Sequence, residues 1–400
     1  MVVVFGVMKE EIFCKTPWKT LEICPNGNLK FCSNLRTVIG NLNGDIDQAF
    51  NSKPVVDFRK RILSGDLEYL KEICKICLDH ESCGNDSYRV ICNRMCSDEE
   101  ISSEKVENAK GISILHCAFG NECNLMCSMC GPEYSSRWSA LESVRIPKID
   151  LSKVLGIIKD NVDSLKLIKF AGGEPLLVPE HRKCLEYLTE SGRSQNIALL
   201  YTTNFSVPEK NIEDVVEFWE EFSNVTLSLS LDAIGDLGEY CRFGFSWSRF
   251  KQNLNTVLGR TKPFVRIAPT VHVLNILGLV DIYLFFQGMQ KKFGTRISLD
   301  WGNLVYTPED LSLVYLPYDA KIEIKRKLLD KAAMELVDSE QLDEFLGQIE
   351  PILEKLEKNG QEHKDTSRVL SKISRLDQIY QIEYKNVEPD VYSTILKYGR

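Results

Sequence analysis

The sequence predicts an α/β fold: a partial (β/α)6 TIM-like barrel that follows a cysteine-rich N-terminal domain and precedes a helical C-terminal extension. Between residues 111 and 305, six short apolar runs alternate with amphipathic stretches of helical spacing. Such alternation is typical of a parallel sheet with crossover helices, and six repeats indicate an incomplete barrel rather than a closed barrel of eight. The chain has 14 cysteines, and all but Cys184 and Cys241 precede residue 131.

The predicted strands and helices follow one another in a regular order. Strands are expected at 112–117, 165–173, 197–204, 225–232, 264–273 and 296–301. Helical spacing is found near 134–144, 151–161, 181–190, 211–222, 247–259 and 278–291. In barrels of this kind, functional residues lie at the C-terminal ends of the strands, so the segments that follow the strands are expected to carry the chemistry.

Four segments are expected along the chain. Residues 1–96 are rich in cysteine and in turn-forming dipeptides, and residues 97–110 form a polar linker or an exposed helix. Residues 111–305 form the partial barrel. Residues 306–400 form the helical, highly charged C-terminal extension.

Composition and charge exclude several classes of protein. A net charge of −8 argues against a broad nucleic-acid surface, because such a surface needs a basic stripe. The N-terminal MVVVFGVMKEE lacks the basic start of a signal peptide, and apolar runs such as ILGLV at 276–280 are short for a membrane span. We therefore expect a cytoplasmic protein with no membrane partner. In a reducing compartment, clustered cysteines indicate metal sites rather than disulfides.

The segment NECNLMCSMCG carries three cysteines in the loop after the first predicted barrel strand. They are Cys123, Cys127 and Cys130, spaced x3 and then x2. A zinc site would need a fourth ligand, which Cys117 or His116 could supply. A [4Fe–4S] cluster could instead use three protein thiolates and leave one iron open. The spacing alone leaves both interpretations in place.

The second predicted barrel strand ends in FAGGEPLL. Two successive glycines allow another group to approach the backbone closely, and the carboxylate that follows can accept hydrogen bonds from an ammonium group. By itself, GGEP could be a simple strand-to-helix turn. Its position one strand after the three-cysteine loop favours a functional role.

Together, the cysteine loop and the GGEP strand end resemble the radical S-adenosylmethionine (SAM) superfamily over about residues 111–305. The resemblance implies that Cys123, Cys127 and Cys130 bind a [4Fe–4S] cluster, whose fourth iron is chelated by SAM. Reductive cleavage of SAM would yield a 5′-deoxyadenosyl radical that takes a hydrogen atom from the substrate. A flavodoxin- or ferredoxin-type donor would supply the electron.

The resemblance also assigns further residues to SAM. The ammonium group would contact Gly172, Gly173 and Glu174, and the third strand would end on Asn204. Ser230 and Asp232 would contact the ribose of SAM. Arg242 would pair with its carboxylate, and Met129 would contact its adenine. Many family members carry an aromatic residue where this chain has Met129, and a thioether can also pack on a ring.

The N-terminal cysteines form a separate constellation. Two separated cysteine pairs could make a closed zinc site. However, this part of the chain resembles the SPASM/twitch domains of radical SAM enzymes, which bind auxiliary [4Fe–4S] clusters. The resemblance rests on three segments in this order: CKTPW, PNGNLKFC and CKICLDHESC. We expect one auxiliary cluster on Cys14, Cys32, Cys74 and Cys77, with Cys83 competing for one place. A second cluster involving Cys24, Cys92 and Cys96 is the weaker alternative.

The predicted domain departs from the SPASM pattern in two ways. It precedes the barrel, whereas such domains usually follow it. In addition, Ser87 stands where the full motif would place another cysteine after Cys83. The second departure is the reason for expecting a single auxiliary cluster.

Cys241 is the one candidate catalytic thiol. It directly precedes Arg242, so it could face the substrate and return a hydrogen atom to a substrate radical. The alternative is a small apolar packing residue, which is the commoner role of a buried cysteine.

These features predict a radical SAM enzyme of oxidoreductase or epimerase type. By analogy with SPASM relatives, the expected substrate is a peptide or natural product, which would be crosslinked, oxidised or epimerised. A sugar or aminoglycoside-like small molecule is the alternative substrate. A zinc-stabilised, non-catalytic binding protein is the alternative from another class.

Overall fold

The computed structural model describes residues 12–82, 86–96, 101, 105–358, 363 and 365–399. The chain divides into two compact units. The first contains Met1–Glu122, Arg145–Tyr201 and Phe218–Val225, and the second contains Cys123–Val144, Thr202–Glu217 and Thr226–Arg400. Half of the predicted linker at 97–110, namely 97–100 and 102–104, lies outside the described residues.

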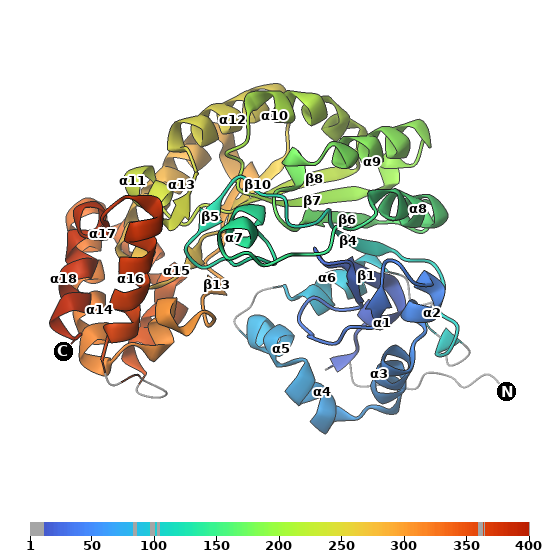
Figure 1. The fold of residues 1–400 in the computed structure, drawn as a ribbon, viewed down its shortest axis with the longest axis horizontal. Helices are drawn as coiled ribbons and strands as arrows, with labels where there is room; N and C mark the ends of the chain where they lie inside the picture. The colour runs from blue at the N-terminus through green and yellow to red at the C-terminus, as the bar shows by residue number, and fades with distance from the viewer. Residues whose placement is uncertain are drawn as a thin grey trace. The chain divides into compact units, whose positions relative to one another are not determined.

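The first unit begins with short helices and a hairpin and continues into the first part of the barrel (Figure 1). Its helices are α1 (Thr16–Lys19), α2 (Ile46–Phe50), α3 (Lys53–Ser64), α4 (Leu67–Ile73), α5 (Lys75–Ser82), α6 (Tyr88–Met95), α8 (Leu151–Asn161) and α9 (Pro179–Glu190). Its strands are β1 (Thr20–Ile23), β2 (Asn28–Lys30), β3 (Gly40–Asn41), β4 (Ile114–Ala118), β6 (Leu167–Ala171) and most of β7 (Ala198–Thr203).

The sheet of the first unit has the order β7-β6-β4-β1-β2-β3. Strands β4, β6 and β7 are parallel, in the register Leu115↔Ile168 and Ile168↔Leu199. Strand β1 also pairs in parallel with β4, from Thr20↔Ile114 to Ile23↔Cys117. No pattern in the sequence predicts this last pairing, which makes the N-terminal hairpin part of the barrel sheet.

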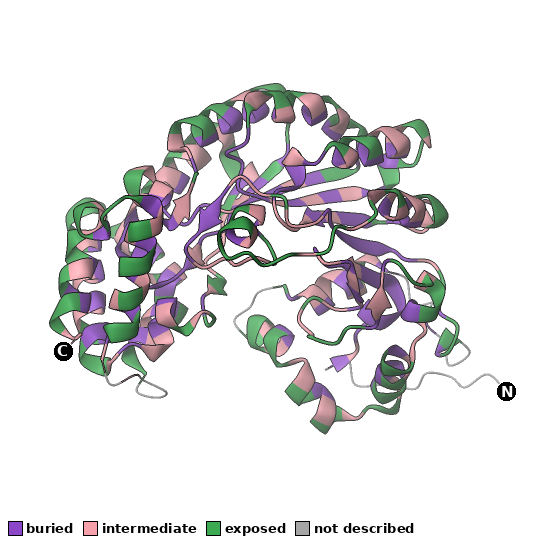
Figure 2. Ribbon diagram, viewed as in Figure 1, coloured by how far each residue is buried: buried purple, intermediate pink, exposed green. Residues whose placement is uncertain are grey.

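The second unit holds the rest of the barrel. Strands β8 (Asn224–Leu229), β10 (Phe264–Ile267) and β12 (Ile297–Leu299) are parallel. Its helices before the extension are α7 (Ser136–Leu141), α10 (Glu209–Val216), α11 (Gly235–Cys241), α12 (Trp247–Arg260) and α13 (Leu279–Phe293). The short strand pairs are β5 (Met126–Cys127) with β9 (Arg242–Phe243), and β11 (Thr270–Val271) with β13 (Asn303–Leu304). Within each unit, buried residues follow the strands and exposed residues lie on the outer helix faces (Figure 2).

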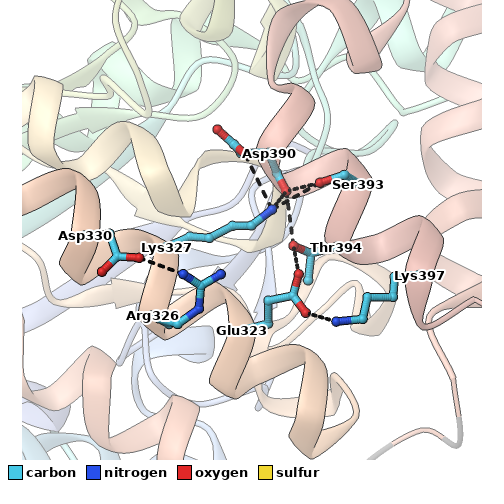
Figure 3. A network of polar contacts seen from close by, with 8 residues as sticks. All are labelled: Glu323, Arg326, Lys327, Asp330, Asp390, Ser393, Thr394 and Lys397. Atoms are coloured by element: carbon cyan, nitrogen blue, oxygen red, sulfur yellow. Dashed lines mark hydrogen bonds and ion pairs between the residues drawn. The ribbon is translucent and has the colours of Figure 1, made fainter.

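The C-terminal extension is helical, as predicted. It consists of α14 (Tyr318–Glu335), α15 (Ser339–Glu357), α16 (Ser367–Tyr380), α17 (Tyr384–Val387) and α18 (Pro389–Lys397). Figure 3 shows the polar contacts that join α14 to α18, including Glu323 with Lys397 at 2.5 Å and Lys327 with Asp390 at 3.5 Å. At least one partner in each pair is well exposed, so each pair contributes only about 0–1 kcal/mol.

The predicted α/β class and the alternation of strands and helices are confirmed, and one predicted strand is divided into two. The segment 264–273 was expected to be continuous, but it forms β10 and the separate β11. Pro269 lies between them, and because proline has no N–H to donate, it interrupts the ladder.

One described helical stretch is long and apolar enough to cross a membrane by length and composition. It is Val273–Arg296, and 61% of its most apolar window is buried inside the fold. The core helix of a soluble protein shows the same pattern.

Candidate active site

In the first unit, strand β6 ends at the two glycines of the GGEP motif. Gly172 has φ +109°, and a Cβ on Gly173 would lie only 2.2 Å from the carbonyl oxygen of Glu122. The N–H of Gly173 donates to Gly120 O at 3.1 Å, and the N–H of Glu174 donates to Glu122 O at 2.7 Å. The glycines are therefore required for the strand end to pack against the segment directly before Cys123 in the sequence.

The carboxylate of Glu174 is held in a fixed place. Glu174 is 1% exposed. Its Oε1 accepts a hydrogen bond from the N–H of Leu176 at 3.2 Å, and this bond caps the 3-10 turn that follows. A buried carboxylate at a strand end has the charge and position expected for binding an ammonium group.

In the second unit, the three-cysteine loop is held by its backbone. Strands β5 and β9 pair Cys127 with Arg242. The indole N–H of Trp138 donates to Cys127 O at 3.0 Å, and the N–H of Ser128 donates to Cys241 O at 2.8 Å. Because these contacts use main-chain atoms of the loop, they fix its path while the thiols keep their capacity to bind metal.

A buried ion pair lies beside the loop. The Arg242 Nε is 2.7 Å from Asp232 Oδ2, its Nη2 donates to Oδ1 at 2.9 Å, and its Nη1 is 3.6 Å from Cys127 Sγ. Burial by itself would lower the pKa of Arg242, but Asp232 and Cys127 raise it above its usual value. Burial raises the pKa of the Cys127 thiol, and the Arg242 charge offsets part of that rise. The pair thus holds the guanidinium of Arg242 beside the sulfur of a candidate cluster ligand.

The other residues assigned to SAM lie in the second unit. Asn204 is buried, donates to Asn124 Oδ1 at 2.9 Å and accepts from the N–H of Ser206 at 2.8 Å. Ser230 and Met129 are partly exposed. Their contacts with SAM stay predictions, as do those of Asp232 and Arg242.

Cys241 is the last residue of helix α11, and it is 0% exposed. Burial, followed by the charge of Asp232, raises the pKa of its thiol well above the usual value. The predicted hydrogen-donating role of Cys241 stays a prediction.

Four thiols of the first unit line one buried cavity. Cys14 precedes α1, Cys32 follows β2, Cys74 ends α4, and Cys77 lies in α5. Burial and then the neighbouring sulfurs raise the pKa of Cys74 to about 12. Because clustered anionic sulfurs repel one another, deprotonation of this set requires a cationic group at its centre, and the iron atoms of a cluster supply such charge.

The other N-terminal cysteines are Cys24, Cys83, Cys92 and Cys96. Cys83 is outside the described residues. Cys92 and Cys96 pack in an apolar cluster with Ile114 and Leu167. Neither these two nor Cys24 lines the four-thiol cavity.

The described thiols do not converge on a single ion. Among the residues with a described placement, no three His, Cys, Asp or Glu side chains come close enough together to hold one metal ion. A zinc ion draws its ligands into a small tetrahedron, whereas a four-iron cluster spreads its thiolates around a larger body.

Comparison with known families decides the assignment. A model of the radical SAM superfamily matches residues 118–284, and a model of an iron–sulfur cluster-binding domain, SPASM, matches residues 14–78. The chain carries a radical SAM domain. No curated protein matches the chain.

The two matches account for the motifs described above. The radical SAM match contains the three-cysteine loop and the GGEP strand end, and the SPASM match begins at Cys14 and ends just after Cys77. This radical SAM enzyme therefore uses SAM, a [4Fe–4S] cluster and an auxiliary iron–sulfur site, as the sequence predicted. When bound, the cluster on the loop supplies the electron that cleaves SAM.

Several supporting residues could not be found from the sequence. Trp138, Ser135 and Asn124 hold the loop or its neighbours, and Asn34 Nδ2 is 3.2 Å from Cys77 Sγ. They carry no signature, because residues of these types are common and only the fold brings them to the site. The one local signal is the Ser135 cap of α7, which also donates its hydroxyl to Leu125 O at 2.7 Å.

Gly173→Ala should lower SAM cleavage by about tenfold to a hundredfold, because its methyl group would overlap Glu122 O and force the backbone apart at a cost of about 1–3 kcal/mol. The measurement is 5′-deoxyadenosine release by the reconstituted enzyme. Gly156→Ala is the matched control, since nothing lies within 4 Å of a Cβ at that helical position. Equal activities in the two variants would contradict the packing role of Gly173.

Proposed function

We propose that this radical SAM enzyme oxidises a peptide, forming a crosslink or a dehydrogenated residue. The observation that carries the proposal is the auxiliary cavity, where Cys14, Cys32, Cys74 and Cys77 line one buried space. Four protein thiolates would complete the ligand set of a [4Fe–4S] cluster and leave no iron open to a substrate. A fully ligated cluster is suited to receive an electron from a substrate radical rather than to bind the substrate directly.

This electron balance favours oxidation over epimerisation. A substrate that loses a hydrogen atom to the 5′-deoxyadenosyl radical must lose one more electron and a proton to become an oxidised product. Epimerisation instead needs a thiol that reaches the substrate and returns a hydrogen atom. Cys241, the candidate for that role, has no exposed surface.

The peptide substrate rests on the SPASM-type domain alone. Domains of this kind accompany peptide-modifying enzymes, and analogy at the level of the fold is a weak guide to the substrate. A sugar or aminoglycoside-like molecule is the second candidate. We further propose a flavodoxin- or ferredoxin-type electron donor and a cytoplasmic location.

Deuterium transfer tests the substrate class. The reconstituted enzyme, with SAM and dithionite, would receive a perdeuterated peptide pool in one reaction and perdeuterated sugars in another. Mass spectrometry would then measure deuterium in the released 5′-deoxyadenosine. Enrichment with the peptides supports the proposal, whereas enrichment with only the sugars replaces it with the second candidate.

A further inference from the structure

The C-terminal helices α16 and α17 lie outside both family matches, yet α16 contacts the cluster loop within the second unit. Helix α16 ends at Tyr380, whose hydroxyl donates to Met126 O at 2.6 Å. Met126 directly precedes the cluster ligand Cys127. A side chain from the extension therefore holds the main chain of the loop at the centre of the three-cysteine motif.

Tyr380 also contacts the strand opposite the loop. Its ring stacks on Phe243, with centroids 4.4 Å apart and an angle of 8° between the planes. Because Met126 pairs with Phe243 across β5 and β9, Tyr380 touches both members of one cross-strand pair. The next pair along these strands is Cys127 with Arg242, so Tyr380 supports the strand that carries the ligand and the strand that carries the arginine.

The end of α16 is itself fixed by a partly buried network of hydrogen bonds. The Asp377 Oδ1 atom accepts from Tyr240 Oη at 2.6 Å and from the N–H of Tyr384 at 3.0 Å. The hydroxyl of Tyr384 donates to Leu274 O at 2.7 Å. These bonds tie α16 and α17 to α11 and to the segment after β11, so Tyr380 is presented from a rigid base.

A second, indirect link runs from α16 to the loop through Trp138. The guanidinium of Arg375 lies 5.8 Å from the ring centroid of Trp138, and it pairs with Glu142 at 2.5 Å. Trp138 in turn donates its indole N–H to Cys127 O. Helix α16 is thus linked to the carbonyl groups of two consecutive loop residues, to Met126 directly through Tyr380 and to Cys127 indirectly through Arg375 and Trp138.

We propose that the C-terminal extension is part of the radical SAM machinery and that Tyr380 is a positioning residue for the cluster loop. The Tyr380 hydroxyl donates a hydrogen bond to the buried main-chain carbonyl of Met126. It thereby fixes the geometry of the three thiols. The inference depends on the cluster loop and is independent of the substrate.

The test compares Tyr380→Phe with Tyr384→Phe. Each variant keeps its aromatic ring and loses one buried hydroxyl that donates to a main-chain carbonyl, but only Tyr380 bonds to the loop. Hydrogen–deuterium exchange would follow the peptide that covers 123–130 in the cluster-free protein. Electron paramagnetic resonance would follow the SAM-dependent change in the reduced, reconstituted enzyme, and thermal unfolding would compare the overall stability of the two variants.

In Tyr380→Phe, the loop should exchange about fivefold to tenfold faster, as expected for the loss of one hydrogen bond, and the SAM-dependent signal should broaden. Tyr384→Phe should leave both loop readouts unchanged, although its unfolding temperature should fall by a similar amount. The proposal is overturned if the two variants alter the loop equally, or if Tyr380→Phe leaves both loop readouts as in the unaltered protein.

Discussion

Replacing Cys127 with alanine should abolish 5′-deoxyadenosine release and remove about four irons per chain. Cys127 is the middle cysteine of the loop, it lies on β5, and its Sγ is 3.6 Å from Arg242 Nη1. With two thiolates left, the loop cannot hold three irons of a cluster, so SAM has no site at which to be reduced. Iron analysis and chromatography of the reaction products measure the two effects.

Cys184→Ala is the matched control for this variant. Cys184 is also a buried thiol, in α9, and burial raises its pKa to about 12, but it belongs to neither set of candidate ligands. The control should keep its iron and its activity. Release of 5′-deoxyadenosine by Cys127→Ala at the level of the control would contradict the assignment of the loop.

Replacing both Cys74 and Cys77 with alanine should remove about four irons while SAM cleavage in the absence of substrate continues. Both residues line the auxiliary cavity in the first unit, whereas the three-cysteine loop belongs to the second unit. The variant should therefore retain one cluster and lose the electron acceptor that the proposed oxidation needs. Iron analysis, 5′-deoxyadenosine release and deuterium-labelled product formation separate these outcomes.

Two single variants define the auxiliary ligand set. Cys92→Ala should keep all of its iron, because Cys92 packs in an apolar cluster and does not line the cavity. Cys83→Ala should do the same if Cys14, Cys32, Cys74 and Cys77 are the four ligands. Loss of about four irons from either variant would place that cysteine in the set.

Local patterns predicted the parts of the fold that depend on local spacing. Helix α8 occupies 151–161, as its apolar spacing indicates, and β6 and β7 lie within their predicted ranges. The cysteine loop and the GGEP strand end could also be found, because both are contiguous motifs. The four auxiliary cysteines were identified from two separated segments only because those segments resemble a known domain.

Contacts between distant segments could not be predicted in this way. The pairing of β1 with β4 joins residues more than 90 positions apart in sequence, and the Tyr380 bond reaches Met126 from a segment with no recognisable motif. The Arg242–Asp232 pair was also not expected, since each residue was assigned to SAM separately. Periodicity reports which face of an element is buried, but it does not report which other element covers that face.

The pairing of β1 with β4 has a consequence for attempts to simplify the enzyme. A truncated chain that starts at residue 111 would lose β1, so the outer side of β4 would become an edge strand with exposed N–H and C=O groups from Ile114 to Cys117. All the residues of β4 are buried, so the new edge would also be apolar. Such an edge recruits other chains and promotes aggregation. The cysteine-rich segment therefore also protects the barrel sheet against self-association.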